Sequence, residues 1–212
     1  MPYGTWIIRE IESPKGYALS EEEIAVTIGK VDEVVEIELV NYFIKGNIAL
    51  TKVDEDCPDN KLSGAVFEVY SDTNGDGKLD NDDTLLGEMK ELDGGVYQMS
   101  ELRYDKYLVK ETKAPTGFVL DEDVYAVSIE ENGKTYTVEN KAGVGFINAA
   151  QKGSLKIVKT SSDGKVEGFS FRVTGVDYDH TFKTDKNGEI VIEGLRIGDY
   201  TVSEVSDKAS AG

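Results

Sequence analysis

The chain has 212 residues, and 41 acidic against 23 basic side chains give it a formal net charge of −18. A chain this acidic repels nucleic acid and anionic lipid, so neither nucleic acid nor a membrane is an expected partner. Its single cysteine and single histidine exclude an intramolecular disulfide and a Cys/His metal cluster.

The first 45 residues carry a motif that returns later in the chain. The motif reads Glu-x3-Pro-x-Gly-aromatic-x-Leu and covers residues 10–19. Glu10 is in phase with Trp6, and Asn41 is in phase with Leu39. Because side chains alternate along a strand, both polar residues are expected on the apolar faces of strands.

A new alternating segment begins at Gly46 and reads GNIALTK. The period of two predicts a half-buried strand. Lys52 is in phase with Ile48 and Leu50, so a lysine is expected on the buried face of this strand.

An acidic loop follows at residues 72–83, with oxygen-bearing side chains at loop positions 1, 3, 5, 9 and 12 and glycine at position 6. The spacing resembles the calcium loop of EF-hands and dockerins, except that Asp replaces Glu at the last position. The predicted ligands are Asp72, Asn74, Asp76, the backbone carbonyl of Lys78, Asp80 and Asp83. The alternative is an acidic hairpin turn, in which Asn-Gly and Asp-Gly supply the backbone angles. Apart from this Ca²⁺, no cofactor is expected.

The glutamate motif returns at residues 111–120. Glu111 ends an alternating segment and is in phase with Tyr107 and Val109. A third, partial copy ends at Glu204, which is in phase with Val202. A glutamate is therefore expected on the buried face of each of these strands.

Asparagine and lysine repeat with the same regularity. Asn148 stands five residues before Gly153, as Asn41 stands five residues before Gly46. Asn140 is also in phase with apolar neighbours and is the alternative to Asn148. In the last segment Lys159 is in phase with Ile157 and is the expected equivalent of Lys52, whereas Lys156 lies on the opposite face.

Short alternating runs separated by Asn-Gly and Asp-Gly turns predict an all-β fold of antiparallel sandwiches. The internal repeats divide the chain into three parts. We expect the second half of one unit at residues 1–45, a complete unit at 46–152 and the first part of a further unit at 153–212.

The recurrence of lysine, glutamate and asparagine on buried faces has a chemical consequence. Burial lowers the pKa of a lysine and raises that of a glutamate, which favours a nucleophilic amine beside a proton-donating acid. Attack of the amine on the asparagine carboxamide, with loss of ammonia, would leave an amide cross-link, and fixed proximity could supply roughly 7–11 kcal/mol of its barrier. The alternative is a buried Lys–Glu salt bridge beside a hydrogen-bonded asparagine.

The glutamate motif resembles that of the collagen-adhesin B-type (CnaB, or prealbumin-like) domains of Gram-positive surface adhesins and pilins. The resemblance implies an Ig-like sandwich of about seven strands with reversed topology. It also implies an isopeptide bond between the first and last strands, with Lys52 as nucleophile, Asn148 as electrophile and Glu111 as promoter.

The two outer parts each lack one member of this set. The first has Glu10 and Asn41 without a lysine strand, and the last has Lys159 and Glu204 without an asparagine strand. One hypothesis is that the half units complement each other, within one molecule or between two, by pairing Lys159 with Asn41.

The tandem units favour a structural stalk module of a cell-wall-anchored adhesin or pilus, with neighbouring CnaB-like domains as partners. The alternative is a ligand-binding adhesin domain that recognises host matrix or glycan. The chain is not expected to be an enzyme, since its cross-linking would turn over once. The expected location is extracellular, with the signal peptide and wall anchor outside residues 1–212.

Overall fold

The computed structural model describes residues 4–205, and within them every regular element is a β-strand. The predicted all-β fold is therefore confirmed. In this range the chain has no helix that could span a membrane. The chain forms two compact units, one of residues 1–114 with 120–148 and one of residues 115–119 with 149–212. The first 45 residues thus group with the central segment.

The N-terminal segment contains one antiparallel pair, formed by β1 (Gly4–Arg9) and β2 (Glu23–Ile28). Most of its side chains are exposed, and Val26 is its buried apolar residue. The strand expected around Asn41 does not form in the described residues, where the stretch makes only an isolated bridge, from Phe43 to Tyr17.

The glutamate motif forms a tight turn between its proline and its aromatic residue. The N–H of Tyr17 donates to the carbonyl of Pro14 at 3.0 Å, and Gly16 has a φ of +85°. Only glycine adopts that angle without strain, so the Pro-x-Gly-aromatic spacing encodes this turn. The second copy of the motif repeats it, with Gly117 at a φ of +84°.

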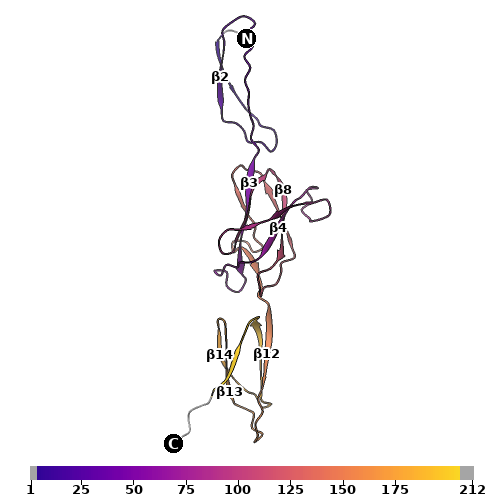
Figure 1. Ribbon diagram of the computed structural model, residues 1–212, viewed down its shortest axis with the longest axis vertical. Coiled ribbons are helices and arrows are strands. Elements are labelled where there is room, and N and C mark those ends of the chain that lie inside the picture. The colour runs from indigo at the N-terminus through magenta and orange to yellow at the C-terminus, as the bar shows by residue number, and fades with distance from the viewer. Residues whose placement is uncertain (1–3, 206–212) are drawn as a thin grey trace. The chain divides into compact units, whose positions relative to one another are not determined.

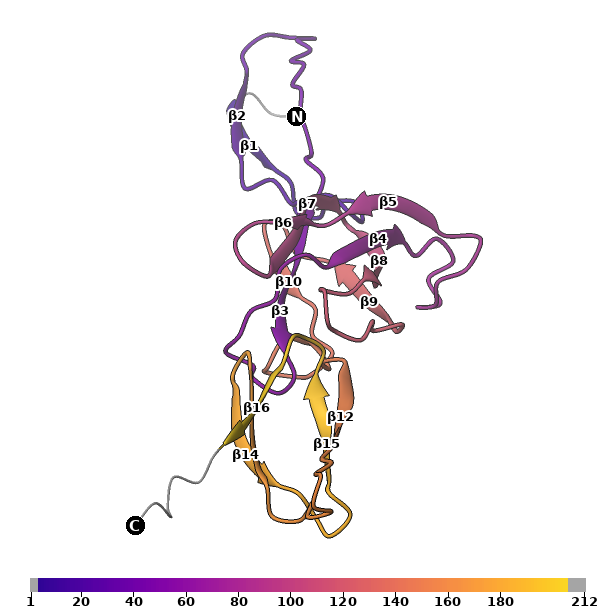
Figure 2. The ribbon, with the colours of Figure 1, turned by 60° about the horizontal axis from the view of Figure 1, so that its bottom comes forward.

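The central segment is a sandwich of two sheets (Figure 2). One has the order β10-β3-β7-β6, with β11 also pairing with β3, and its strands are β3 (Lys45–Asp54), β6 (Lys90–Glu91), β7 (Val96–Arg103), β10 (Thr135–Thr137) and β11 (Phe146–Asn148). The other has the order β5-β4-β8-β9, formed by β4 (Val66–Ser71), β5 (Thr84–Glu88), β8 (Asp105–Lys113) and β9 (Val124–Ile129). Figure 1 labels β3, β4 and β8 in this segment.

The alternating sequence pattern predicted antiparallel pairs throughout the sandwich, but two of its pairs are parallel. Strands β10 and β11 both run parallel to β3. Parallel neighbours need a crossover, and the chain supplies it by passing from β9 in the other sheet to β10. The first and last strands of the segment therefore lie side by side and run in the same direction.

Aromatic and branched side chains from both sheets fill the core of the sandwich. Phe67 meets Tyr97 and Phe146 edge to face, with ring centroids 5.2 and 4.9 Å apart. Gly145 allows β11 to reach β3, since a Cβ at this position, where φ is +131°, would lie 2.8 Å from the carbonyl oxygen of Thr51. This close approach places the end of β11 over the core.

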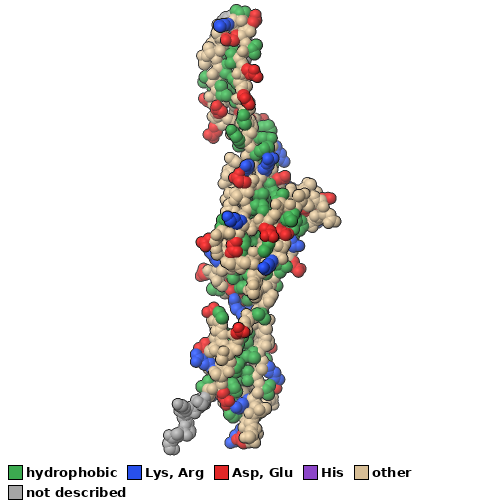
Figure 3. Space-filling model, in the orientation of Figure 1, with side chains coloured by type: hydrophobic (Ala, Val, Ile, Leu, Met, Phe, Trp, Pro, Cys, Tyr) green, Lys and Arg blue, Asp and Glu red, His purple; other side chains and the backbone are tan. Residues whose placement is uncertain are grey.

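The second compact unit is smaller. It contains the pair β12 (Lys152–Val158) and β15 (Glu189–Arg196) and the three-stranded sheet β14-β13-β16, formed by β13 (Ser170–Gly175), β14 (Tyr178–Lys183) and β16 (Thr201–Val205). Its core consists of Phe171, Val173, Ile190, Ile192 and Leu195. Acidic side chains are dispersed over the visible face of both units, as the net charge requires (Figure 3).

Candidate functional site

Lys52 lies on β3 with its side chain fully buried in the core of the sandwich. Its Nζ donates to the carbonyl of Phe146 at 3.1 Å and lies 5.0 Å from the centroid of that ring. Burial lowers the pKa of the Lys52 ammonium to about 8, although the charge of Glu111 opposes the shift. A lysine of this kind reaches its neutral, nucleophilic form far more readily than one in water.

Glu111 faces Lys52 from the opposite sheet. It lies on β8, its side chain is fully buried, and its Oε1 is 3.7 Å from Lys52 Nζ. Burial raises the pKa of the Glu111 carboxyl, although hydrogen bonds from the backbone of Asp121 and from Asn148 act in the other direction. Opposite shifts in the two partners bring the neutral pair closer in free energy to the ion pair.

Asn148 ends β11 and completes the cluster. Its Nδ2 donates to both carboxylate oxygens of Glu111, at 3.0 and 2.9 Å. Its Oδ1 is buried and accepts no hydrogen bond. Beside an ionised glutamate only the amide N–H groups can donate, whereas a protonated glutamate could donate to Oδ1, the atom that must be polarised for attack on the carboxamide.

Three polar groups from β3, β8 and β11 therefore meet in a dry core. Strand phase predicts a buried face for each of them, and their exposed fractions are 0%, 0% and 3%. An unpaired charge buried this deeply would cost several kcal/mol, so the cluster is held by its mutual contacts.

Asn140, the alternative electrophile, makes different contacts. Its side chain brackets the backbone of Ile147, accepting from the N–H at 2.6 Å and donating to the C=O at 2.8 Å. Its Nδ2 also donates to Asp121 Oδ2 at 2.7 Å. Asn140 thus fixes the strand that carries Asn148, while its carboxamide is engaged away from Glu111.

Asp121 is a site residue that the sequence patterns did not single out. Its backbone N–H donates to Glu111 Oε2 at 2.8 Å. Burial by itself would raise the pKa of the Asp121 carboxyl. Hydrogen bonds, among them those from Asn140 and Tyr125, outweigh burial, so that the pKa lies below its ordinary value. The repeat contains a signal for this contact, because Asp121 follows Glu111 at the same spacing as Ser20 follows Glu10. Ser20 likewise donates its N–H to Glu10 Oε2, at 2.8 Å.

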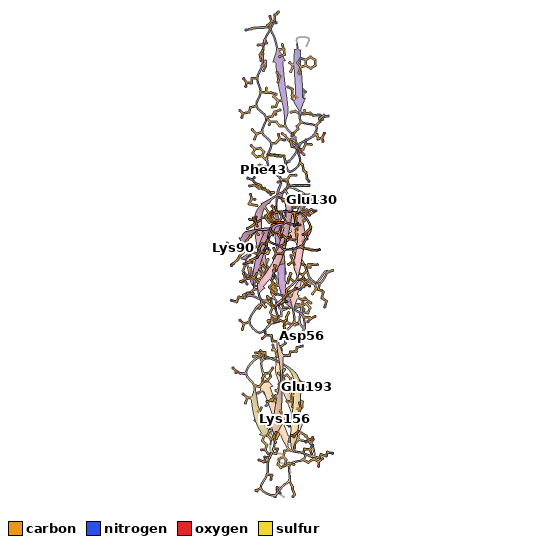
Figure 4. The ribbon with its side chains drawn as sticks, turned by 90° about the vertical axis from the view of Figure 1, so that its right-hand side faces the viewer. Phe43, Asp56, Lys90, Glu130, Lys156 and Glu193 are labelled. Atoms are coloured by element: carbon orange, nitrogen blue, oxygen red, sulfur yellow. The ribbon has the colours of Figure 1, made fainter. Side chains whose placement is uncertain are left out.

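The outer segments hold incomplete versions of the cluster. Asn41 Nδ2 donates to Glu10 Oε1 at 2.5 Å, and Lys159 Nζ pairs with Glu204 Oε2 at 2.8 Å. The second pair is not dry, since the Lys159 and Glu204 side chains are 20% and 45% exposed. The expectation that Glu204 faces a buried interior is wrong, because no further strand covers β16 in the described residues. Lys156, labelled in Figure 4, instead forms an exposed ion pair with Glu189.

The predicted calcium loop connects β4 to β5. In residues 4–205 no three acidic, histidine or cysteine side chains converge closely enough to hold a metal ion. The carboxylates of the loop accept backbone hydrogen bonds instead, among them Gly77 N to Asp72 Oδ2 at 3.1 Å and Asp82 N to Asp80 Oδ1 at 2.8 Å. Asp72 Oδ1, however, is buried and accepts no hydrogen bond.

The family model described as the SpaA prealbumin-like fold domain matches residues 1–42, 46–142 and 153–210. A solved structure of the Bacillus anthracis TIE protein is 28% identical with a TM-score of 0.75, and the match covers 97% of this chain and 37% of that one. The chain therefore spans little more than a third of that protein. A comparison with curated proteins gave no match.

Two pilin structures are more distant. A streptococcal ancillary pilin is 17% identical with a TM-score of 0.38, over 97% of this chain and 67% of that one. The shaft pilin SpaA of Lactobacillus rhamnosus GG is 16% identical with a TM-score of 0.40, over 77% of this chain and 89% of that one. At these scores neither carries a conclusion about this chain.

Proposed function

Since the chain belongs to the SpaA family of prealbumin-like fold domains, we propose that it is a structural module of a bacterial surface adhesin or pilus, closed in its central segment by a Lys52–Asn148 isopeptide bond. Domains of this family are structural rather than enzymatic, so the chain is not an enzyme. The proposal includes a location outside the cell, in a protein anchored to the cell wall.

The observation that carries the proposal is the arrangement of Lys52, Glu111 and Asn148. A buried amine lies 3.7 Å from a buried carboxylate, which in turn accepts both hydrogen bonds of a buried carboxamide. A salt bridge alone would not need the asparagine, nor would it leave Asn148 Oδ1 without a donor. The arrangement suits an acid-promoted attack on the carboxamide carbon.

The proposed reaction balances without any outside reagent. Glu111 takes a proton from the Lys52 ammonium and shares it with Asn148 Oδ1 while the neutral Nζ attacks Cγ. The Cγ–Nζ bond forms and the Cγ–Nδ2 bond breaks. The second proton leaves Nζ through Glu111 and joins the leaving group, which departs as ammonia. The first proton returns from Oδ1 to Glu111 as the C=O bond re-forms, so Glu111 ends protonated.

A stalk that is pulled at its ends gains from such a bond. Strands β3 and β11 are the first and last of the central segment and lie parallel, so a link between them carries tension through covalent bonds. By loop-closure entropy, a cross-link that closes a loop of roughly 100 residues stabilises a fold by about 4–5 kcal/mol. We further propose that the segments 1–45, 46–152 and 153–212 belong to tandem units, which the three separate family matches support.

Intact-mass spectrometry of the purified chain tests the bond. We expect a mass one ammonia below that of the sequence, and a peptide in which Lys52 is joined to residue 148 after digestion. Lys52→Ala, Glu111→Ala and Asn148→Ala should each restore the full sequence mass. Lys45→Ala is the matched control, because Lys45 lies on the same strand in an exposed ion pair with Glu101, and it should keep the deficit. A wild-type chain at full mass would overturn the proposal.

A further inference from the structure

The β4–β5 loop of residues 72–83 contains a buried carboxylate oxygen that the protein leaves without a donor. Asp72 is only 5% exposed, and its Oδ1 accepts no hydrogen bond. Its other oxygen accepts from Gly77 N inside the loop, so the carboxylate is directed into the loop. A buried carboxylate oxygen with no partner costs free energy that a bound cation would recover.

The rest of the loop offers more oxygens than its own backbone uses. Asn74 Oδ1 accepts from Asp76 N at 2.9 Å, and Asp76 Oδ1 accepts from Lys78 N at 2.8 Å. These bonds use one oxygen of the Asp76 carboxylate and leave its second oxygen available.

The chemistry of the donors selects the ion. We infer that the loop binds one Ca²⁺ through the side chains of Asp72, Asn74, Asp76, Asp80 and Asp83 and the carbonyl of Lys78. All of these are hard oxygen donors, and their spacing is the one that surrounds Ca²⁺ in a twelve-residue loop. Gly77, at a φ of +76°, supplies the sharp bend at the sixth position.

Hydrogen bonds within the loop hold the carboxylates near its end. Asp83 Oδ1 accepts from Thr73 N at 3.0 Å, and its Oδ2 accepts from Asp80 N at 2.9 Å. Asn74 Nδ2 donates to Asp80 Oδ2 at 3.0 Å. Binding of the ion must exchange these contacts for metal–oxygen contacts.

The loop is tied to the strand that carries Glu111. Asp72 N donates to Lys106 O at 3.0 Å, and Lys106 Nζ donates to Gly75 O at 2.9 Å. An ion that binds only the folded loop stabilises the folded state in proportion to the logarithm of its concentration. Ca²⁺ should therefore raise the unfolding temperature of the sandwich as well as order its loop.

Calorimetric titration of the chelator-treated chain with CaCl₂ tests the inference. We expect heat from a single site and a higher unfolding temperature in Ca²⁺ than in chelator. Asp72→Ala and Asp76→Ala should lose both effects, and Asp76→Ala is the informative variant because the Asp76 side chain is exposed. Asp163→Ala is the control, since Asp163 accepts similar backbone bonds in an exposed turn outside the loop, and it should titrate like the wild type.

Absence of heat and of any shift in unfolding temperature would overturn the inference, as would an unchanged titration of Asp76→Ala. Binding of MgCl₂ with equal affinity would overturn the assignment to Ca²⁺. The intact mass of the same samples is measured in parallel. The isopeptide bond and the calcium site can then fail separately.

Discussion

Three side chains define the candidate site, and the two that titrate, Lys52 and Glu111, have the pKa shifts that their roles require. Burial lowers the pKa of Lys52 to about 8 and raises that of Glu111. The reactive state, a neutral amine beside a protonated acid, holds one proton between the two groups. The ion pair holds the same number, so the two states exchange without taking up or releasing a proton.

This proton count predicts the pH dependence of bond formation. Between the two pKa values the rate should be independent of pH. Above about pH 8 the pair loses its remaining proton, so the rate should fall about tenfold for each further pH unit. Below the raised pKa of Glu111 a second proton binds, the amine stays charged, and the rate should fall again.

The measurement starts from chain isolated unreacted in denaturant and diluted into buffers of different pH, with the loss of ammonia followed by mass spectrometry. A rate that keeps rising above pH 9 would show that only the amine must be neutral and would remove Glu111 as the acid.

At the scale of the element, short β11 must be positioned accurately although it has only three residues. Gly145 lets it approach β3, and Asn140 holds the backbone of Ile147 with two hydrogen bonds. The turn of the glutamate motif does the same for β8 by returning the N–H of Asp121 to Glu111. The reactive groups are thus fixed by neighbours that do not react.

Asn140→Ala should slow bond formation without preventing it. A misplacement of about 1 Å can cost up to roughly a hundredfold in rate, so we expect a slowing of about tenfold to a hundredfold. The cross-linked peptide should still contain residue 148. Asn132→Ala is a suitable control, because Asn132 accepts a backbone bond from Lys45 in an exposed turn. If Asn140→Ala abolished the bond while Asn148→Ala kept it, Asn140 would be the electrophile.

On the scale of the whole molecule, the outer segments hold complementary parts of the central cluster. The first pairs Asn41 with Glu10 and has no lysine beside them in the described residues, while the last pairs Lys159 with Glu204. Ile7 on β1 and Ile11 just after it are exposed, and an added strand would cover such apolar surface and the open edge of the β1–β2 pair.

Complementation predicts that Lys159 of one molecule joins Asn41 of another when the chain is concentrated. Denaturing gels should then show a dimer that increases with concentration and disappears in Lys159→Ala and in Asn41→Ala. Lys156→Ala should still form it, since that lysine is occupied by Glu189 on the exposed face. Monomer alone at the highest concentration would exclude complementation between molecules.

The sequence by itself determined the all-β class, the strands that contain Lys52 and Glu111, the turns at its glycines and the burial of the three central groups. These properties follow from local rules, because strand phase and turn geometry act over a few residues. The tertiary structure alone decided what depends on residues far apart. It set β11 parallel to β3, directed Asn148 rather than Asn140 to Glu111, brought in Asp121 and left Glu204 exposed. Such outcomes depend on which strand becomes whose neighbour, and strand phase specifies a face but not the partner that covers it.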